Sequence, residues 1–546
     1  MDPTFVLLSA FLISVFALGI FIWSMRNGAF HDSGGAKVIF MAHEVGHVED
    51  PAAAPQALTA LQRTVGVKQG HTSATIAEEL ASRAQADRSS ATVTFVFLCC
   101  AIGWLLLGSF AGLISSIKLH NPDWLTGAEW LTFGITRTIH LNAVAYGWTS
   151  MAGLGLAMWL LPRLLNTTLQ GGRFALIGAM LWNAGLIAGI GSIAAGFATG
   201  LEWLEMPWQV DLLLVAGGAL IGIPLLLTLA RRTVDHLYVS VWYLGAALFW
   251  FPILYLVANL PGVHFGVEQA TLNWWYSHNV LGYFFTPLAQ ATIYYFVPKV
   301  IGRPLQSYTL SLLGFWTQAF FYGMVGAHHL IGGPVPSWLV TLSIVQSVMM
   351  IVPVVAFATN HALTMQGYWK TVVYSPTLRF MVVGGIAYIL VSLQGTVEAL
   401  RSVNTITHFT HFTVAHAHLG MYAFVAITLS GGIYFVMPRV LGREWPYPRW
   451  IAAHFWLDLV GITVYVVSLS IGGWRQGLAM LDATRPFIDS VAVTLPWLKA
   501  RSIGGALMTL GHLVFAVHFL AMVLDLGPRR DRAALFHLAR SADHAK

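Results

Sequence analysis

The sequence predicts an all-α protein that crosses a membrane many times. Of its 546 residues, 57% are hydrophobic and only 10% are charged, whereas a water-soluble domain carries about a quarter charged residues. The mean hydropathy is +0.68. Thirteen apolar stretches are long enough to cross about 30 Å of hydrocarbon as helices: 4–24, 93–117, 130–162, 174–200, 208–230, 237–260, 270–298, 307–331, 336–360, 378–400, 405–437, 450–473 and 503–526. We therefore predict one leading span followed by a block of twelve.

The leading stretch, 4–24, predicts a permanent membrane helix. It is too long for a cleaved signal peptide and lacks the basic start and the small-residue cleavage site. The long polar stretch after it contains the Ala/Pro-rich run Asp50–Pro55 and a helix-like segment Ser73–Ala86, as a linker would. We expect an N-terminal membrane segment, a cytoplasmic linker, the twelve-helix domain and a cytoplasmic tail, at 1–50, 51–90, 91–530 and 531–546.

Charged residues in the loops predict the orientation. Basic residues gather on one side of the twelve-helix block: Arg163, Arg173, Arg231, Arg232, Lys299, Arg303, Lys370, Arg379, Arg439, Arg443, Arg449, Arg529 and Arg530. The opposite loops carry acidic residues: Asp123, Glu129, Glu202, Glu205, Asp211 and Glu268. By the positive-inside rule the basic side is cytoplasmic, so the block both begins and ends inside. The net charge of +6 then reflects membrane orientation, and we expect a lipid bilayer and no nucleic acid as partner.

Cysteine usage limits the cofactors that the chain can attach covalently. Its two cysteines, Cys99 and Cys100, are adjacent on an apolar span, and no Cys-x-x-Cys-His motif occurs. The chain therefore offers no disulfide framework and attaches no c-type haem. Any c-type haem must belong to a partner.

Six histidines lie within the predicted spans at a similar depth. An ionisable side chain at membrane depth costs about 2.5–3.5 kcal/mol on insertion scales, so those that remain usually face a cavity or a ligand. By the topology above, all six lie in the outer third of the membrane: His140, His278, His328, His329, His416 and His418. A single membrane histidine is at least as often a hydrogen-bonded core residue, but six at one depth favour a cofactor site.

Helical geometry divides these histidines between cofactors. His416 and His418 point about 200° away from each other at 100° per residue, so they serve two cofactors, one on each face of the helix. A haem ligated by His418 needs a second histidine from another helix at the same depth, and His140 is the natural candidate. That haem would be low-spin and pass electrons only, while a haem on the His416 face keeps an open position for a gas.

The remaining three histidines predict a metal ion facing that open position. His278, His328 and His329 offer three neutral imidazoles, which suit copper and, less distinctively, zinc or iron. Adjacent residues differ by about 100° on a regular helix. However, His328 and His329 stand just before Gly332–Gly333–Pro334, where the helix must end and its geometry can relax. We therefore expect all three to converge on one ion.

Hydroxyl and amide side chains predict a proton route from the cytoplasmic side. The stretches 270–298 and 307–331 hold no Asp, Glu, Lys or Arg. On 307–331, helical geometry places these residues within an arc of about 80°: Tyr308, Ser311, Gln318, Tyr322 and His329. Thr286 and Tyr294 on the preceding helix extend this stripe. The alternative is hydrogen bonding between helices, which we prefer for Thr286 alone, whereas we assign a functional role to Tyr322.

Four segments resemble the catalytic subunit of the cbb3-type branch of the haem–copper oxidases. They are Asn-Trp-Trp-Tyr-Ser-His-Asn (273–279), Tyr-Tyr-Phe-Val-Pro-Lys (294–299), Tyr-Gly-Met-Val-Gly-Ala-His-His (322–329) and His-Phe-Thr-His-Phe-Thr-Val-Ala-His-Ala-His (408–418). The resemblance covers roughly residues 90–526. It implies a twelve-helix haem–copper oxidase bundle in a bacterial inner membrane, with metal sites in the periplasmic-side third. Here one extra N-terminal transmembrane helix precedes the bundle.

The resemblance also implies cofactors and residue roles. It implies two haems b and one copper ion, with copper bound by His278, His328 and His329, the high-spin haem by His416, and the low-spin haem by His140 and His418. Tyr322 matches the tyrosine that in this branch is covalently joined to the copper ligand corresponding to His278 and that supplies an electron and a proton when the O–O bond breaks. Thr286, Tyr294, Tyr308 and Ser311 match the family's single proton channel. Glu202 matches an acidic residue beside the haem propionates and a bound calcium, and His408 a histidine near the propionates.

Some positions depart from the family pattern. Gln394 stands where the family usually has a glutamate hydrogen-bonded to the proximal haem histidine. Because such groups tune the basicity of a ligand, we expect the haem potential to differ. His411 stands where an aspartate is common. The first fifty residues, with Phe-Ile-Trp-Ser-Met-Arg-Asn-Gly-Ala-Phe-His-Asp, resemble the small maturation protein of cbb3 oxidases, which predicts a fusion; an extra anchoring helix is the alternative.

The expected function is that of a proton-translocating cytochrome c oxidase. It would reduce O2 to water with electrons from cytochrome c, delivered through membrane-anchored c-type cytochrome subunits. Nitric oxide reduction is the alternative within the superfamily, where related enzymes replace copper with iron and add a glutamate. Leu281 and Gly282 stand where those relatives would place that carboxylate, which favours copper and O2. A transporter without haem would place its ionisable groups near the midplane, unlike these six histidines.

Overall fold

The computed structural model describes residues 73–530, Ala534 and isolated positions from Leu12 to Arg26, and for residues 73–80 it describes the backbone alone. The predicted segment 1–50, most of the predicted linker 51–90 and the tail 531–546 therefore lie largely outside the described residues. The isolated N-terminal positions are helical. Among them, the ring of Phe16 packs on Phe249, with the two centroids 4.8 Å apart.

Between residues 73 and 530 the chain is built of helices and contains no strand. The α-helices are α3 (Ser73–Lys118), α4 (Phe133–Asn142), α5 (Ser150–Leu164), α6 (Gly172–Ala194), α7 (Trp208–Ala230), α8 (Val239–Ala258), α9 (Gly266–Val280), α10 (Thr286–Ile301), α11 (Tyr308–Phe321), α12 (Ser337–Met349), α13 (Ile351–Met365), α14 (Pro376–Glu398), α15 (Arg401–Thr407), α16 (His411–His418), α17 (Ile427–Leu441), α18 (Pro448–Leu481), α19 (Phe487–Ala492) and α20 (Leu495–Val523). Three segments are 3-10 helices: η3 (Glu129–Leu131), η6 (Tyr322–Leu330) and η7 (Trp369–Val373). Three are π-helices: η4 (Ala143–Thr149), η5 (Leu281–Phe285) and η8 (Leu419–Ala426).

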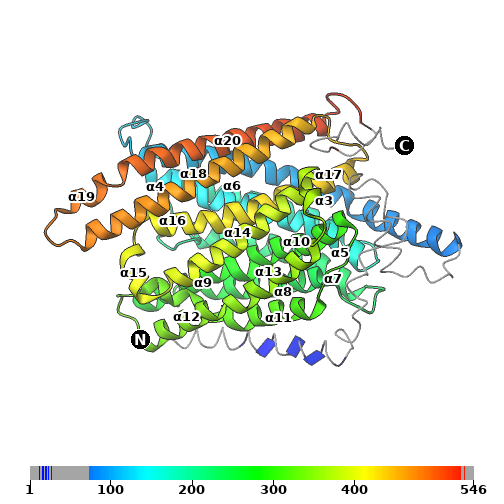
Figure 1. The fold of residues 1–546 in the computed structure, drawn as a ribbon, viewed down its shortest axis with the longest axis horizontal. Coiled ribbons are helices and arrows are strands. Elements are labelled where there is room, and N and C mark those ends of the chain that lie inside the picture. The colour runs from blue at the N-terminus through cyan, green and yellow to red at the C-terminus, as the bar shows by residue number, and fades with distance from the viewer. Residues whose placement is uncertain are drawn as a thin grey trace.

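Eleven helical segments of the described chain are long and apolar enough to cross a membrane. They coincide with eleven of the twelve spans predicted for the main block. The twelfth, predicted at 307–331, is formed by α11 and η6 in series. Figure 1 shows these helices running side by side along the long axis of the molecule. The predicted all-α, polytopic fold is confirmed.

Three spans form the inside of the bundle. The most apolar stretch of Phe133–Leu164 is 94% buried, that of Gly266–Ile301 is 89% buried and that of His411–Leu441 is 78% buried, whereas no other span exceeds 50%. A helix that is apolar all round is a buried one, and every residue of α5 is buried. These inner spans carry His140, His278 and the pair His416 and His418, so the predicted ligands stand on the central helices.

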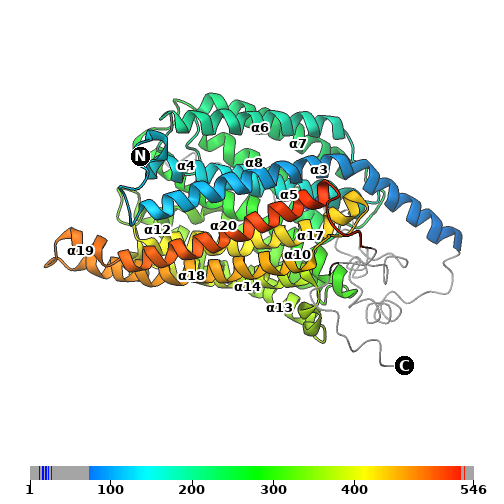
Figure 2. The ribbon, with the colours of Figure 1, turned by 90° about the horizontal axis from the view of Figure 1, so that it is seen from above.

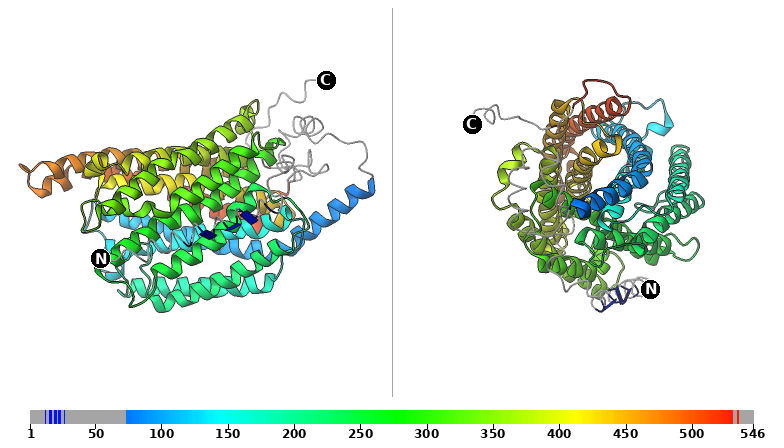
Figure 3. Two further views of the ribbon diagram at one scale, coloured as in Figure 1. Left: turned by 90° about the horizontal axis from the view of Figure 1, so that it is seen from below. Right: turned by 90° about the vertical axis from the view of Figure 1, so that its right-hand side faces the viewer.

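The outer helices pack in pairs through small residues. Figure 2 shows α6 and α7 along one edge of the bundle, and Figure 1 shows α18 and α20 along the upper edge. The end-on view in Figure 3 shows both pairs outside the inner helices. A Cβ on Gly178 of α6 would lie 2.7 Å from the carbonyl oxygen of Gly217, and one on Gly461 of α18 would lie 2.8 Å from that of Gly504. Such close backbone approach is how membrane helices associate without a hydrophobic driving force between them.

Helix α3 continues without a break across the predicted linker boundary at residue 90. Its first turns project beyond the rest of the bundle (Figure 2). Where α3 meets α5, Arg163 donates to both carboxylate oxygens of Asp87 at 2.8 and 2.6 Å, and its guanidinium lies 4.2 Å from the ring centroid of Trp159. This bidentate pair fixes α3 against the inner helix. The domain boundaries themselves stay a prediction.

Candidate metal and haem centre

The inner helices leave regular α geometry next to the predicted ligands. The π-helical segments η4, η5 and η8 each begin within three residues after His140, His278 and His418, respectively. Single π turns in α-helices recur at functional sites. The hydrophobic periodicity gave no sign of these turns, because one inserted residue hardly changes a pattern that is apolar on every face.

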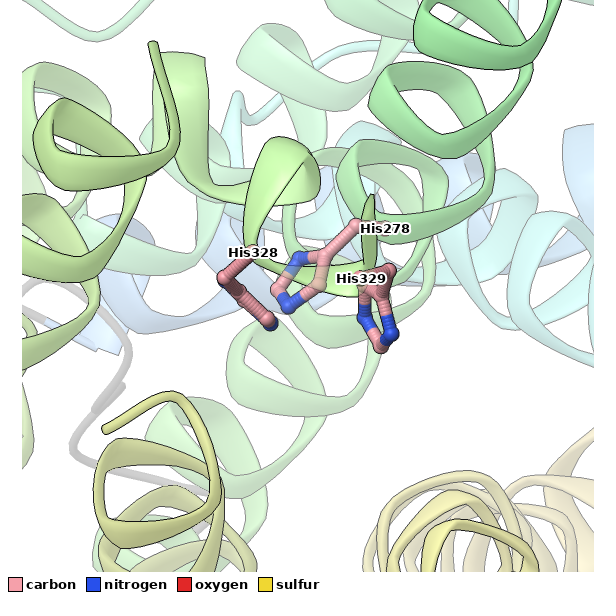
Figure 4. Close-up of side chains that lie close together, drawn as sticks. All are labelled: His278, His328 and His329. Atoms are coloured by element: carbon pink, nitrogen blue, oxygen red, sulfur yellow. The ribbon is translucent and has the colours of Figure 1, made fainter. Parts of the chain in front are cut away.

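His278, His328 and His329 converge on one point (Figure 4). One ring nitrogen of each lies within 4.8 Å of those of the other two. Nδ1 of His328 lies 3.2 Å from the hydroxyl of Ser343 and 3.1 Å from that of Ser347, which leaves its Nε2 for a metal ion. Nδ1 of His278 is buried and has no hydrogen-bond partner among the described residues. Three neutral imidazoles at this spacing fit a copper ion with metal–nitrogen bonds of about 2 Å.

The adjacent pair His328 and His329 stands on a 3-10 helix. Segment η6 begins at Tyr322, well before Gly332–Gly333–Pro334, where relaxation was expected. With three residues per turn, consecutive side chains differ by about 120°. The predicted α-helical arc of 80° therefore applies only as far as Phe321 and does not describe His329, whose ring stacks on Trp274 with centroids 4.5 Å apart.

Tyr322 packs against this triad of histidines. Its ring centroid lies 5.3 Å from that of His278. The ring also lies on the backbone of Gly282, where a Cβ would overlap the Tyr322 ring atoms. Any side chain at 282, a carboxylate included, would displace Tyr322. Only glycine fits at position 282 without moving Tyr322. The glutamate expected for the nitric oxide reductase alternative therefore does not fit beside this tyrosine.

His140 and His418 face each other as a parallel pair. Their ring planes differ by 6° and their centroids lie 6.2 Å apart. Two imidazoles on opposite sides of one metal ion have centroids about 6 Å apart, since each metal–nitrogen bond is about 2 Å and each ring centre lies about 1 Å behind its nitrogen. Nδ1 of His140 lies 2.7 Å from the carbonyl oxygen of Gly108, and Nδ1 of His418 lies 2.9 Å from that of Val414. Nε2 of His140 remains for ligation, and Nε2 of His418 lies 3.2 Å from the Tyr465 hydroxyl, so the parallel pair fits a bis-histidine haem once a metal ion takes the place of that contact.

His416 lies on the other side of the same helix, as its spacing from His418 predicts. Its charge would act on all three histidines of the triad. Its Nδ1 is buried and lies 3.8 Å from Oε2 of Glu398, whose Oε1 accepts a hydrogen bond from the Thr413 hydroxyl at 2.9 Å. A Cβ on Gly395 would lie 2.8 Å from Cε1 of His416, so glycine lets α14 approach this ring closely.

The carboxyl group beside His416, the predicted axial ligand, is thus that of Glu398. The sequence predicted a departure at Gln394, and Gln394 contributes no carboxylate, but Glu398 stands one helical turn further along α14. Residues four apart lie on the same face of a helix. Oε1 of Gln394 is buried and has no hydrogen-bond partner among the described residues. Glu398 follows Gln394 by four residues in the sequence, but a single sequence does not specify how α14 is rotated toward His416.

Glu202 holds together the loop between α6 and α7. Its Oε1 accepts a hydrogen bond from Arg137 at 2.7 Å, and its backbone carbonyl accepts from Asn273 at 2.9 Å and from Ser277 at 2.8 Å. These contacts tie the loop to α9, which carries His278. The predicted calcium beside Glu202 stays a prediction.

Glu205 is a second, buried carboxyl group in this loop, and no sequence signal singled it out. Burial and the neighbouring charge of Glu202 raise its pKa to about 7. The Asn142 amide donates a hydrogen bond to its Oε2 at 3.0 Å. Because Asn142 stands two residues after His140, this carboxyl group lies beside the helix that carries a predicted haem ligand.

Two cations and two further histidines surround the His140–His418 pair and the triad. Arg501 of α20, which the sequence did not single out, donates to the Tyr465 hydroxyl at 3.0 Å, and that hydroxyl lies 3.2 Å from Nε2 of His418. The charges of Arg501 and Arg137 both act on His140 and His418. The ring of His408 lies against the backbone of His329, and the backbone N–H of His411 donates to Gln476 at 3.0 Å. Two arginines here fit the carboxylates of a haem.

The predicted proton route is polar along its length and buried over its middle part. Tyr308 lies 2.7 Å from Nε2 of His236 and donates to the Leu237 carbonyl at 3.0 Å. Further along α11, Ser311 accepts from Asn360 at 2.9 Å and Gln318 donates to the Gly282 carbonyl at 3.0 Å. Tyr294 is fully buried and Thr286, the first residue of α10, is partly buried.

Three more polar residues join this route, and the sequence did not single them out. Along this route five buried polar atoms have no hydrogen-bond partner among the described residues: Tyr294 OH, Gln318 Oε1, Gln290 Oε1, Tyr388 OH and His361 Nε2. The His361 ring lies 4.6 Å from that of Tyr294. Ordered water usually satisfies such groups. The available signal was a polar residue on an otherwise apolar span, which Gln290 and His361 both give.

Comparison with known proteins identifies the family of the chain. The family model described as Cytochrome C and Quinol oxidase polypeptide I matches residues 92–507. The cbb3-type cytochrome c oxidase subunit CcoN1 of Stutzerimonas stutzeri is 31% identical over 454 residues, which cover 80% of this chain and 96% of the relative. Cytochrome c oxidase subunit 1 of Rhodobacter capsulatus is 30% identical over 444 residues, which cover 77% and 83%.

More distant similarities extend to other enzymes. A nitric oxide reductase chain of Stutzerimonas stutzeri is 24% identical over 441 residues, which cover 75% of this chain and 90% of the relative. Among solved structures, a heme-copper terminal oxidase dimer determined by cryo-EM is similar with a TM-score of 0.61 at 16% identity, covering 81% of this chain and 85% of that one. This structural likeness concerns the fold.

Proposed function

The chain belongs to the family of cytochrome c and quinol oxidase polypeptide I, and we propose that it is the catalytic subunit of a respiratory oxidase that reduces O2 to water. Electrons would come from cytochrome c through membrane-anchored c-type cytochrome subunits, with proton uptake and translocation coupled to the reaction. The observation that carries the proposal is the convergence of three imidazoles with Tyr322 packed against His278.

The proposed cofactors are two haems b and one copper ion. His278, His328 and His329 would hold the copper, His416 the high-spin haem, and His140 and His418 the low-spin haem. When bound, these cofactors supply the redox chemistry that carries electrons to O2. The chain's part is to orient the ligands. The hydroxyls of Ser343 and Ser347 direct Nδ1 of His328, and the backbone carbonyls of Gly108 and Val414 direct the low-spin pair.

Tyr322 would supply a proton and an electron at the site, and the proton route would return the proton. This route begins at Tyr308 with His236 and continues through Ser311 and Gln318. It includes the buried polar groups near Tyr294 that have no hydrogen-bond partner among the described residues. The excess of basic residues in the loops at the Tyr308 end supports a cytoplasmic entrance. The metal site would then lie in the periplasmic-side third of a bacterial inner membrane.

Nitric oxide reduction is the second candidate because one relative carries that name. That chemistry calls for a carboxylate near His278 in related enzymes. Gly282 is covered by the Tyr322 ring, and no Asp or Glu belongs to the histidine triad among the described residues. Both observations favour copper and O2.

The decisive experiment combines metal and haem analysis of the purified complex with consumption of O2 and of nitric oxide, in the wild type and in Tyr322→Phe. We expect two haems b and one copper for each copy of this chain, with O2 turnover lost in the variant. Iron in place of copper, with nitric oxide turnover unaffected by the substitution, would support the second candidate. A haem-free protein would refute both.

A further inference from the structure

A second group of buried titratable side chains lies between α17, α18 and α20, away from the histidine triad. It contains Asp458 and the histidines His454, His512 and His518. Their exposed fractions are 2%, 0%, 6% and 0%, respectively. All four stand on apolar spans, where ionisable groups persist mainly for a function. None of them takes part in the function proposed above.

Asp458 is the centre of this group. Its Oδ2 lies 2.8 Å from Nε2 of His454, one turn before it on α18, and 4.0 Å from Nε2 of His512 on α20. Its Oδ1 is buried and has no hydrogen-bond partner among the described residues. A Cβ on Gly511 would overlap this oxygen, so glycine makes the room for the carboxyl group between the two helices.

The group reaches toward the proposed low-spin haem ligands on one side. Nδ1 of His512 lies 2.6 Å from the Ser109 hydroxyl, and its Nε2 lies 2.8 Å from the hydroxyl of Tyr422. Ser109 directly follows Gly108, whose carbonyl lies 2.7 Å from Nδ1 of His140. The charge of His140 also acts on His512. The carboxyl group is thus connected to His140 through His512, the Ser109 hydroxyl and the backbone between Ser109 and Gly108.

On the other side the group reaches the end of the bundle where α17 passes into α18. The Tyr434 hydroxyl lies 2.9 Å from Nδ1 of His454. The Trp445 ring lies 4.9 Å from that of Tyr434 and 4.8 Å from that of His518. Nε2 of His518 accepts a hydrogen bond from the backbone N–H of Tyr447 at 3.2 Å, in the loop just before α18. Titratable groups therefore extend from this loop to the neighbourhood of His140.

Within the described part of the chain, no Lys or Arg contacts Asp458. The titratable groups that face it are His454 on its own helix, His512 on α20, Tyr422 on η8 and Tyr434 on α17. A carboxyl group and imidazoles that share a buried site without a permanent counter-ion reach neutrality by sharing a proton.

We propose that Asp458, with His454 and His512, is a second proton-binding site of this chain, and that its occupancy follows the charge on the cofactor held by His140 and His418. The proposal rests on the function proposed above. When one electron from the donor reduces that cofactor, one proton from the aqueous phase at the Tyr447 end binds the site. When the cofactor is oxidised again, that proton leaves. Only an O–H or N–H bond forms and breaks.

This site is separate from the route that ends at Tyr322. That route runs through α10, α11, α13 and α14, whereas Asp458 stands among α17, α18 and α20 with Ser109 of α3. The Tyr322 route leads to the metal triad and would deliver protons consumed by the reaction. The Asp458 site leads to the ligands of a cofactor that only passes electrons, so its proton is bound and released but not consumed.

The test is a redox titration of the low-spin haem in the purified complex at several pH values between 6 and 9, in the wild type, Asp458→Asn and Asp211→Asn. Asp211 is a matched control, because it is also a buried aspartate, held by Tyr255 at 2.7 Å and Asn259 at 2.5 Å, but on α7. One proton coupled to one electron lowers the midpoint potential by at most about 59 mV per pH unit, which is a tenfold change in affinity. We expect Asp458→Asn to lose at least half of the wild-type slope and Asp211→Asn to keep it.

An unchanged slope in Asp458→Asn, with haem content and O2 consumption intact, would overturn this inference alone. Absence of haem or of O2 consumption in the wild type would instead overturn the proposed function. Should Asp458→Asn not assemble, redox-induced infrared difference spectra of the wild type with 13C-carboxyl aspartate decide the matter. A labelled carboxyl band that changes with reduction supports the site, and the absence of any such band refutes it.

Discussion

Replacing Glu398 by glutamine should raise the midpoint potential of the high-spin haem. Oε2 of Glu398 lies 3.8 Å from Nδ1 of His416. The imidazole ring and one metal–nitrogen bond each add roughly 2 Å, which would place a metal ion on the far nitrogen about 8 Å from the carboxylate. At an effective dielectric constant of about 20, a unit charge at that distance contributes about 2 kcal/mol. Since about 2.3 kcal/mol corresponds to 100 mV, the expected rise is on the order of 90 mV.

The measurement is a potentiometric titration of the purified complex, followed by the absorption of the high-spin haem. The informative control is the double variant Gln394→Glu with Glu398→Gln, which moves the carboxylate back by one turn on the same face of α14. We expect it to return the potential toward the wild-type value. A shift of less than about 20 mV in Glu398→Gln, a small fraction of the Coulomb figure, would show that this carboxyl group is not ionised or does not act on the ligand.

Three further substitutions test the packing and the charges of the helix bundle. Gly282→Ala should destabilise the protein by about 1–3 kcal/mol, because its Cβ overlaps the Tyr322 ring; a lower melting temperature and reduced O2 turnover with copper retained would confirm this. The pKa of Glu205 is raised to about 7. Its burial therefore lowers the stability of the protein increasingly as the pH rises from the ordinary pKa of a glutamate through 7, by up to about 3 kcal/mol. Glu205→Gln should therefore melt above the wild type at pH 8 and together with it near pH 4; identical melting at pH 8 would contradict the shift. Asp87→Asn removes the carboxylate that accepts two hydrogen bonds from Arg163 and should cost about 2–3 kcal/mol, below the usual cost of breaking a fully buried pair because Asp87 is partly exposed. A lower melting temperature of this variant would confirm the cost, and an unchanged one would contradict it.

The membrane spans and the predicted ligands could be inferred from residue types and their positions along the sequence. Span positions depend on local hydropathy, and the rise along a helix converts sequence position into depth. That is why His416 and His418 could be assigned to opposite faces, and why six histidines could be grouped by depth without knowing which helices touch. The proposed copper site then needed only the three remaining histidines.

Relations between helices, and local breaks within them, were not accessible in this way. The π turns after His140, His278 and His418 rotate the helical residues beyond them, and the 3-10 geometry of η6 changes where His329 points. Glu398 was overlooked for a related reason, because its role depends on how α14 is rotated against the helix of His416. A single sequence specifies the face on which a residue lies, but not which neighbour that face meets.

The histidines that were missed differ from those that were found in how they are spread along the membrane normal. A haem or a metal ion requires its ligands to meet at one point, so helices that share a cofactor place their histidines at one depth. Proton transfer must instead cover distance, so the groups of the proposed Asp458 site follow one another from His518 beside Tyr447, through His454 and Asp458, to His512 beside Ser109. Ionisable groups that coincide in depth therefore indicate the ligands of a cofactor. Ionisable groups that follow one another at intervals of one or two helical turns on apolar spans indicate proton transfer instead.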